Sequence, residues 1–159
     1  MHPPPAADPT WIGLVDETLP VAAAQAWATT SDCGAVVAFT GTVRDHSEDR
    51  DGVQSLTYEA YEGRAEEQIA AVVAEARATW PAIRRVAVLH RVGTLSVGEA
   101  AVLVVVASGH RPEAFVAAAF CIDEVKARVP IWKREVWADG EDWGLCEHDH
   151  APHAAEAHR

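Results

Sequence analysis

The stretch Ala101–Ala107, which reads AVLVVVA, decides the fold predicted for this chain of 159 residues. Its uninterrupted, Val-rich apolar pattern is typical of a β-strand that is covered on both faces. A second strand is predicted just before it, over Ile83–Val92, and the turn-like sequence GTLSVGEA joins the two. After it, a helix is predicted over Pro112–Arg128, because Pro112 suits a first helical turn and Pro130 ends the pattern.

Further strands and helices are predicted on both sides of this segment. Strands are expected over Trp11–Leu19, 35–44, Val53–Tyr61 and 131–137, and helices over 20–30 and 64–80. The charged residues 45–52 predict a mobile loop, and the tail from Ala138 onward is expected to be mostly irregular. Helices interspersed among paired strands favour an α+β fold, a mixed α/β sandwich, over a doubly wound parallel sheet.

The charge of the chain argues against some classes of partner. It carries 24 acidic and 13 basic residues, which gives a net charge of −11. General nucleic-acid binding needs a broad basic face, and anionic lipid also attracts basic segments. No apolar run approaches the roughly 20 residues of a membrane span. We therefore expect neither nucleic acid nor a membrane among the partners.

Length and composition predict one folded domain over residues 11–147. The Pro- and Ala-rich residues 1–10 are expected to be a disordered arm, and residues 148–159 a flexible, His-rich tail. The three cysteines show no CxxC spacing, and Cys121 falls in an apolar helical pattern that predicts a core position. Reduced thiols and the lack of a signal-peptide pattern at the start lead us to expect a cytoplasmic protein.

The sequence SGHRP, residues 108–112, is a candidate anion site. It lies where the predicted buried strand leads into the start of a helix, whose free N–H groups and positive dipole end attract anions. Arg111 adds a fork of donors suited to phosphate or carboxylate, and His110 can bind an anion or move a proton. The alternative is that Arg111 is a surface charge and His110 a cap, and the five residues alone leave both open.

The two lysines, Lys126 and Lys133, stand out because the other 11 basic residues are Arg. An amine that must lose its proton cannot be replaced by Arg, which stays protonated. Helical geometry places Lys126 about 20° from Phe115 around the helix and near Ile122, so it is expected over the apolar face. There it would be partly desolvated, which favours the neutral amine. The alternative is a lysine that reaches into water from the last turn.

Lys133 and Arg44 are two further candidates. In the extended segment 131–137, alternation places Lys133 and Glu135 on one side and Trp132 and Arg134 on the other. Arg44 ends the first buried strand of the chain, where rigid scaffolds present residues to sites. A solvated lysine on an edge strand and an ordinary boundary charge remain the alternatives.

The C-terminal tail contains four histidines, His148, His150, His153 and His158. Histidine-rich tracts can bind metals, but this spacing is irregular and no ordered frame accompanies it. No Gly-rich phosphate loop or dinucleotide fingerprint occurs in the chain. We therefore expect no resident metal and no cofactor.

Several motifs together resemble one family. FTGTVRDH (39–46), LTYEAY (56–61), SGHR (108–111) and KARVPIWKRE (126–135), followed by Gly140 and Trp143, resemble the large, catalytic subunit of molybdopterin synthase in order and spacing. The resemblance covers the chain from about Trp11 to Glu147. It implies an α/β hammerhead with an additional antiparallel β part.

The resemblance also implies an activity and partners. The family converts cyclic pyranopterin monophosphate to molybdopterin by inserting two sulfurs as a dithiolene, in molybdenum cofactor biosynthesis. The sulfur arrives on the Gly-Gly thiocarboxylate at the C-terminus of a small ubiquitin-like subunit, so the enzyme is a sulfurtransferase. The large subunit forms a homodimer, and the whole assembly is a heterotetramer.

Carried over position by position, the resemblance implies roles for single residues. Lys126 and Lys133 correspond to the catalytic lysines of the pocket, and the choice between proton transfer and charge stabilisation for each stays open. Phe39 corresponds to an aromatic residue near the path of the partner's tail. The residues that correspond to substrate-binding positions are Thr42, Val43, Arg44, His110, Arg111, Lys126, Lys133, Arg134 and Glu135.

Two other functions remain as alternatives. In the first, the chain is a non-catalytic scaffold whose basic residues only dock the acidic C-terminal tail of a partner. In the second, the chain binds metal through its His-rich tail. The scaffold predicts that binding survives replacement of either lysine by Arg, whereas catalysis predicts that Lys126→Arg binds but does not turn over.

Overall fold

The structure, a computed structural model, describes residues 2–145 of the chain. In chain order its elements are β1 (Thr10–Val15), α1 (Val21–Ala28), β2 (Ala35–Thr42), β3 (His46–Ser47), β4 (Arg50–Asp51), β5 (Val53–Ala60), α2 (Arg64–Thr79), β6 (Ile83–Arg91), β7 (Gly93–Ser96), β8 (Ala100–Ser108), α3 (Arg111–Arg128), β9 (Ile131–Trp137) and β10 (Gly140–Leu145). The α+β class predicted from the sequence is confirmed.

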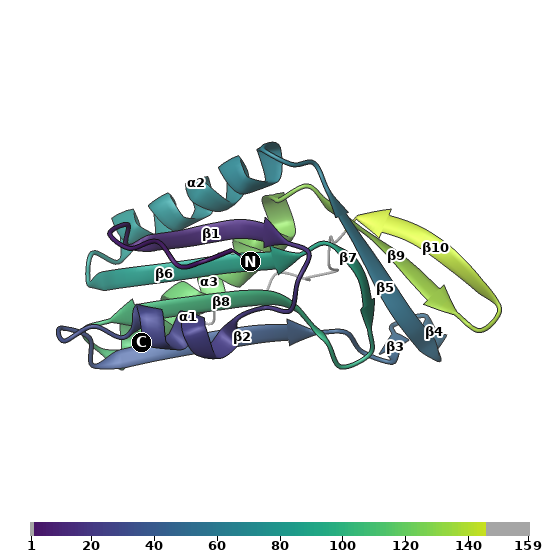
Figure 1. Cartoon of the computed structure of the whole chain (residues 1–159), viewed down its shortest axis with the longest axis horizontal. Coiled ribbons are helices and arrows are strands. Elements are labelled where there is room, and N and C mark those ends of the chain that lie inside the picture. Colours follow the sequence, from purple (N-terminus) through teal and green to yellow (C-terminus); the bar gives the residue numbers. More distant parts are fainter. Residues whose placement is uncertain (1, 146–159) are drawn as a thin grey trace, which may run out of the picture.

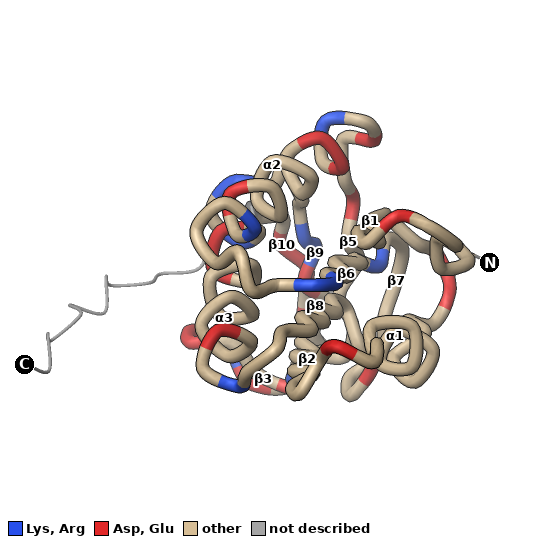
Figure 2. Tube along the Cα trace, turned by 90° about the vertical axis from the view of Figure 1, so that its left-hand side faces the viewer, with Lys and Arg blue, Asp and Glu red and all other residues tan. Residues whose placement is uncertain are grey.

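The first sheet has the strand order β1-β6-β8-β2. β8 pairs antiparallel with both β6 and β2, and β1 pairs parallel with β6. Helix α1 covers one face of this sheet, and α2 and α3 lie side by side on the other (Figure 1, Figure 2). None of the helices in residues 2–145 is long and apolar enough to cross a membrane.

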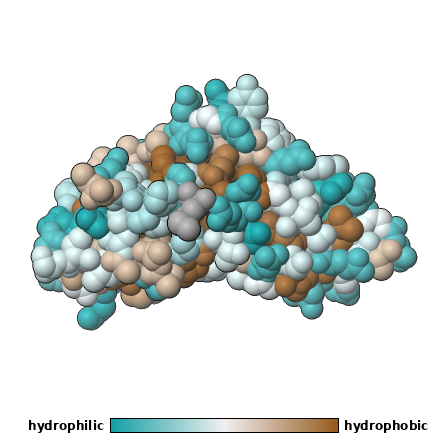
Figure 3. Space-filling view, viewed as in Figure 1, coloured by the Kyte–Doolittle hydropathy of each residue, from teal (hydrophilic) through white to brown (hydrophobic). Residues whose placement is uncertain are grey.

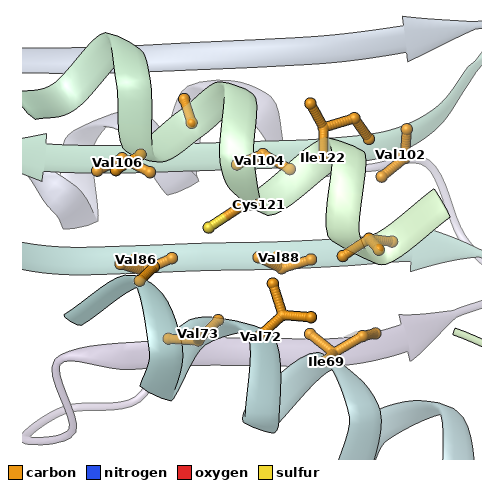
Figure 4. Close-up of a cluster of buried hydrophobic side chains, with 14 of the residues drawn as sticks. Ile69, Val72, Val73, Val86, Val88, Val102, Val104, Val106, Cys121 and Ile122 are labelled. Atoms are coloured by element: carbon orange, nitrogen blue, oxygen red, sulfur yellow. The ribbon is translucent and has the colours of Figure 1, made fainter. Parts of the chain in front are cut away.

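Strand β8 is buried on both faces, as its sequence predicts. Val102, Val104 and Val106 point toward α2 and α3, where they pack with side chains such as Cys121 (Figure 4). The alternate residues, such as Leu103, pack under α1 in a second core. Burial raises the pKa of the Cys121 thiol to about 12, so this cysteine is a core residue, as predicted.

The second sheet has the order β10-β9-β5-β7 and is antiparallel throughout. It lies at the end of the first sheet, where β6 continues through Val92 directly into β7, which begins at Gly93 (Figure 1). Gly93 has a φ of 92°, which only glycine adopts without strain. A small core of Val43, Val53, Leu56, Leu95 and Ala101 fills the junction between the sheets.

Three sequence expectations about these segments are wrong. The GTLS segment is strand β7 and not a turn, because its single buried side chain, Leu95, packs in the junction core. In the described part of the tail, Gly140–Leu145 form β10 through pairing with β9, a partner that the polar sequence of this strand does not reveal. The expected loop 45–52 contains the short hairpin β3–β4.

The ends of the described chain also differ in detail from expectation. β1 ends at Val15 and not at Leu19, although Leu19 is buried under α1. Residues before β1 contact the domain: the Trp27 indole N–H donates to the Pro5 carbonyl at 3.1 Å. The disordered arm over residues 1–10 stays a prediction, and the tail over residues 148–159 lies outside the described residues.

Removing a β8 side chain from the core tests the central position of this strand. Leu103 is fully buried, so Leu103→Ala is expected to lower the free energy of unfolding by about 3 kcal/mol in urea titrations. The exposed Val97, in the turn between β7 and β8, provides the control. Val97→Ala is expected to change stability by less than about 0.5 kcal/mol. Equal losses in both variants would contradict the assignment of β8 as the core strand.

Candidate active site

A pocket of about 650 Å³ opens where the two sheets meet the C-terminal end of α3. This volume lies in the range of small-molecule sites. On the face drawn in Figure 3, hydrophobic residues gather toward the middle of the molecule, near this junction of the two sheets. The pocket walls come from β2 and the loop after it, the β3–β4 hairpin, β5, β6, β8, α3, β9 and β10.

Lys126 lies in the last turn of α3 and lines the pocket beside Ile122 and Val125. Its side chain is half-buried at the border of the apolar face, and not over that face as expected. The expectation that Phe115 marks the apolar face is also wrong, because Phe115 is 61% exposed. The face that packs on the sheet and on α2 consists mostly of small side chains, which allow close approach and leave the large ring outside.

Lys133 lies on β9 and faces the pocket from the second sheet. Its Nζ lies 3.1 Å from Glu135 Oε1, and the strand register places Tyr58 of β5 directly opposite Lys133. Residues directly opposite in antiparallel strands share a face, so all three side chains border the pocket. Arg134 lies on the other face, where it pairs with Glu141 at 3.4 Å. The alternation predicted for this strand is therefore confirmed.

The residues of the FTGTVR motif have different surroundings. Thr42 and Arg44 line the pocket, whereas Val43 is buried in the junction core. Phe39 is partly exposed on edge strand β2 and does not line the pocket. A Cβ on Gly41 would lie 2.7 Å from Val102 Cγ1 and 3.5 Å from the Phe39 ring, so the glycine allows these side chains to approach.

His110 and Arg111 lie at the start of α3, away from the pocket. Both are exposed, and His110 makes no side-chain capping hydrogen bond. At the helical rise per residue, Lys126 lies about 24 Å along the helix from His110. A single copy of the chain therefore brings Thr42, Arg44, Lys126, Lys133 and Glu135 together, but not His110 and Arg111.

His90 is a pocket residue that sequence reasoning missed. It is the next-to-last residue of β6, is 7% exposed, and packs edge-on against Tyr58 with ring centroids 5.1 Å apart. Its Nδ1 donates to the Arg91 carbonyl at 2.7 Å. Burial lowers the pKa of His90 from 6.5 to about 4, the hydrogen bond to Arg91 opposes this shift, and the charge of Lys126 adds to it. The sequence signal that could have identified it is a single histidine near the end of an otherwise apolar strand segment.

The β3–β4 hairpin forms a wall of the pocket that sequence reasoning also missed. Residues 46–50 line it, and Arg50 reaches across to the β9–β10 hairpin. At its base, His46 lies 2.7 Å from Asp45, and this hydrogen bond lowers the pKa of the Asp45 carboxyl. The charged sequence of this segment gave no sign of the long-range partners that hold it.

Within residues 2–145, no group of three or more His, Cys, Asp or Glu side chains is arranged to hold a metal ion. The histidines considered as metal ligands, His148, His150, His153 and His158, lie outside the described residues. The alternative of metal binding through the tail therefore stays untested.

Comparison with known proteins adds an independent line of evidence. The family model described as MoaE protein matches residues 14–128. The chain is 51% identical over 110 residues to a molybdopterin synthase catalytic subunit of Oryza sativa subsp. indica, which covers 69% of this chain and 56% of the relative. It is 38% identical over 133 residues to that of Taeniopygia guttata, covering 84% and 85%. The match thus spans about half the length of the rice relative.

Solved structures show the same fold. The molybdopterin synthase structure from Staphylococcus aureus matches with a TM-score of 0.78 and 36% identity, over 82% of this chain and 94% of that one. A MoaE protein from Burkholderia ambifaria matches with a TM-score of 0.74 and 33% identity, over 89% and 93%. These likenesses support the fold described above.

The buried histidine makes stability depend on pH. In the unfolded chain His90 takes up a proton near pH 6.5, whereas the folded chain keeps it neutral down to about pH 4. The unfolded state therefore binds more protons in this window, and stability falls as the pH falls. Between about pH 7.5 and pH 5, this one group is expected to remove about 2 kcal/mol from the free energy of unfolding.

His90→Gln is expected to remove this part of the pH dependence, as measured by urea unfolding at both pH values. The exposed His110 is a matched control, so His110→Gln is expected to keep the slope of the unaltered chain. If His90→Gln also keeps that slope, His90 is not held neutral in the folded state.

Proposed function

Because the chain belongs to the MoaE family, we propose that it is the catalytic subunit of a molybdopterin synthase. In this function it is a sulfurtransferase that converts cyclic pyranopterin monophosphate to molybdopterin. The sulfur comes from the thiocarboxylated C-terminus of a small ubiquitin-like partner. The free thiols of Cys33 and Cys121 are consistent with a cytoplasmic location.

The observation that carries this proposal is the convergence of the two lysines. Lys126 and Lys133 are the chain's two lysines, and they come from different elements, α3 and β9, yet both line one pocket. Arg44 and Arg50 line it as well, so four cations border a space sized for a small molecule, together with the carboxylates of Glu48, Asp49, Glu135 and Asp142. Such a pocket suits an anionic pterin phosphate.

The surroundings of each lysine support a division of roles. Lys126 is half-buried beside Ile122 and Val125, an apolar setting that suits proton transfer or activation of the thiocarboxylate attack. Lys133 is paired with Glu135, a setting that suits a permanent cation stabilising developing negative charge. We therefore assign proton transfer to Lys126 and charge stabilisation to Lys133.

The position of His110 and Arg111 supports a contribution from a second copy of the chain. The resemblance gives these two residues a role in binding the substrate phosphate, but they lie about 24 Å along α3 from Lys126. In a homodimer, the exposed start of α3 of one copy can face the pocket of the other. We therefore place the phosphate between Arg44 of one copy and His110 and Arg111 of the second.

A non-catalytic scaffold that docks the tail of a partner is the alternative function. The same cations would attract an acidic C-terminus, but a scaffold needs only their charge. Arg preserves that charge and cannot release its proton, so Lys126→Arg separates the two functions.

The test is a single-turnover reaction with thiocarboxylated small subunit and cyclic pyranopterin monophosphate. Lys126→Arg and Lys126→Ala are expected to bind the small subunit but to form product at least about 100-fold more slowly, because proton transfer is lost. Lys133→Ala, assayed separately, reports on the second role. Arg84→Ala, which breaks the exposed ion pair to Asp32 at the other end of β6, is expected to keep full activity. Full activity in the Lys126 variants would refute the assignment.

A further inference from the structure

Arg50 ties the β3–β4 hairpin to the opposite side of the pocket. From β4, its Nη2 donates to Asp142 Oδ2 at 3.0 Å, and its Nη1 lies 3.6 Å from Glu135 Oε2. Its guanidinium also lies over the Trp137 ring, 4.0 Å from the centroid. Three contacts from β9 and β10 thus hold the Arg50 side chain, although these strands are far from Arg50 in the sequence.

Glu135 divides its two oxygens between two cations. Oε1 lies 3.1 Å from Lys133 Nζ, and Oε2 lies on the Arg50 side. The carboxylate is 12% exposed and the Lys133 side chain is 24% exposed, so water screens this pair only in part. The four charged groups form one chain in the order Asp142, Arg50, Glu135 and Lys133.

Arg50 acts on Lys133 indirectly, because it restrains the Glu135 carboxylate that pairs with Lys133. An arginine held by a stacked ring and a second carboxylate is a rigid fork, whereas a lysine ammonium is a point charge on a flexible stem. The fork keeps Oε2 turned away from Lys133 and offsets part of the negative charge of Glu135. Without it, both oxygens can close on the lysine, which would then be less available to a substrate anion.

We propose that Arg50 is a positioning residue for the reaction, which through Glu135 sets the place and the availability of the Lys133 ammonium. This inference rests on the proposed function for its consequence in catalysis. It adds to that function Arg50 of the β3–β4 hairpin, a residue that lies outside the motifs on which the family resemblance rests.

The kinetic test uses single turnover with thiocarboxylated small subunit, as above. Arg50→Met keeps an apolar stem over Trp137 and removes the charge, and it is expected to lower the rate about tenfold because Lys133 is misplaced. Arg50→Lys is expected to recover part of the loss, since it restores charge without the fork. The exposed Arg84 serves again as the matched control, and Arg84→Met is expected to leave the rate unchanged.

A double-variant cycle separates an effect through Glu135 from a direct one. In a Glu135→Gln background, the added Arg50→Met substitution is expected to change the rate by less than about twofold, because the carboxylate it restrains is gone. If Arg50→Met lowers the rate equally in both backgrounds, Arg50 acts on the substrate itself and the proposal is overturned. An unchanged rate for Arg50→Met alone overturns it as well.

A second measurement does not depend on activity. With two lysines in the chain, isotope-labelled lysine gives two side-chain NMR resonances, which Lys→Arg variants assign. Arg50→Met is expected to shift the Lys133 resonance and to leave that of Lys126 nearly in place. If neither resonance moves, Arg50 does not act on Lys133. A chain that forms no product at all refutes the proposed function, and these resonances then still decide the role of Arg50.

Discussion

The pairing of β8 with both β6 and β2 is the constraint on which the rest of the structure depends. Because β8 is apolar on both faces, it can lie only in the middle of a sheet with helices on each side. Its register aligns Gly41, Val102 and His90 in one row across the sheet, on the face that α3 covers. The path of α3 over that face then delivers Lys126 to the end of the row.

The second sheet completes the site by a different means. β7 follows β6 in the chain and pairs with β5, and β5 pairs with β9 on its other side. This pairing places Tyr58 of β5 and Lys133 of β9 opposite each other, facing the pocket. The chain carries a net charge of −11, yet cations line this pocket. Glu135 and Asp142 hold two of these cations in place. Lys and Arg side chains are as numerous in the pocket lining as Asp and Glu side chains, so the pocket suits an anion better than the total charge of the chain suggests.

The sequence predicts those parts of the molecule whose signal is local. An apolar run predicted β8, flanking prolines predicted α3, and alternation predicted which side of β9 bears Lys133. Pairing between distant segments left no such signal, so β10 and the hairpin with Arg50 were missed. The predicted position of the apolar face of α3 was wrong, because small side chains determine how this helix packs. Helical angles alone do not show which residues pack closely.

Candidate site residues divide in the same way. Thr42, Arg44, Lys126, Lys133 and Glu135 meet in one pocket, as the motifs indicated. The side chains of His90 and Tyr58 were missed because single polar residues in strands are common. His110 and Arg111 were grouped with the lysines by their motif, but the length of α3 separates them within one copy, which only a structure reveals.

The central claim is that both lysines act on one substrate molecule in one pocket. A crystal structure of the chain with bound cyclic pyranopterin monophosphate tests it most directly. We predict that the ligand lies in this pocket with the Lys126 and Lys133 ammonium groups both within about 3 Å of its polar atoms. A ligand bound away from this pocket, or in contact with neither lysine, would contradict the account.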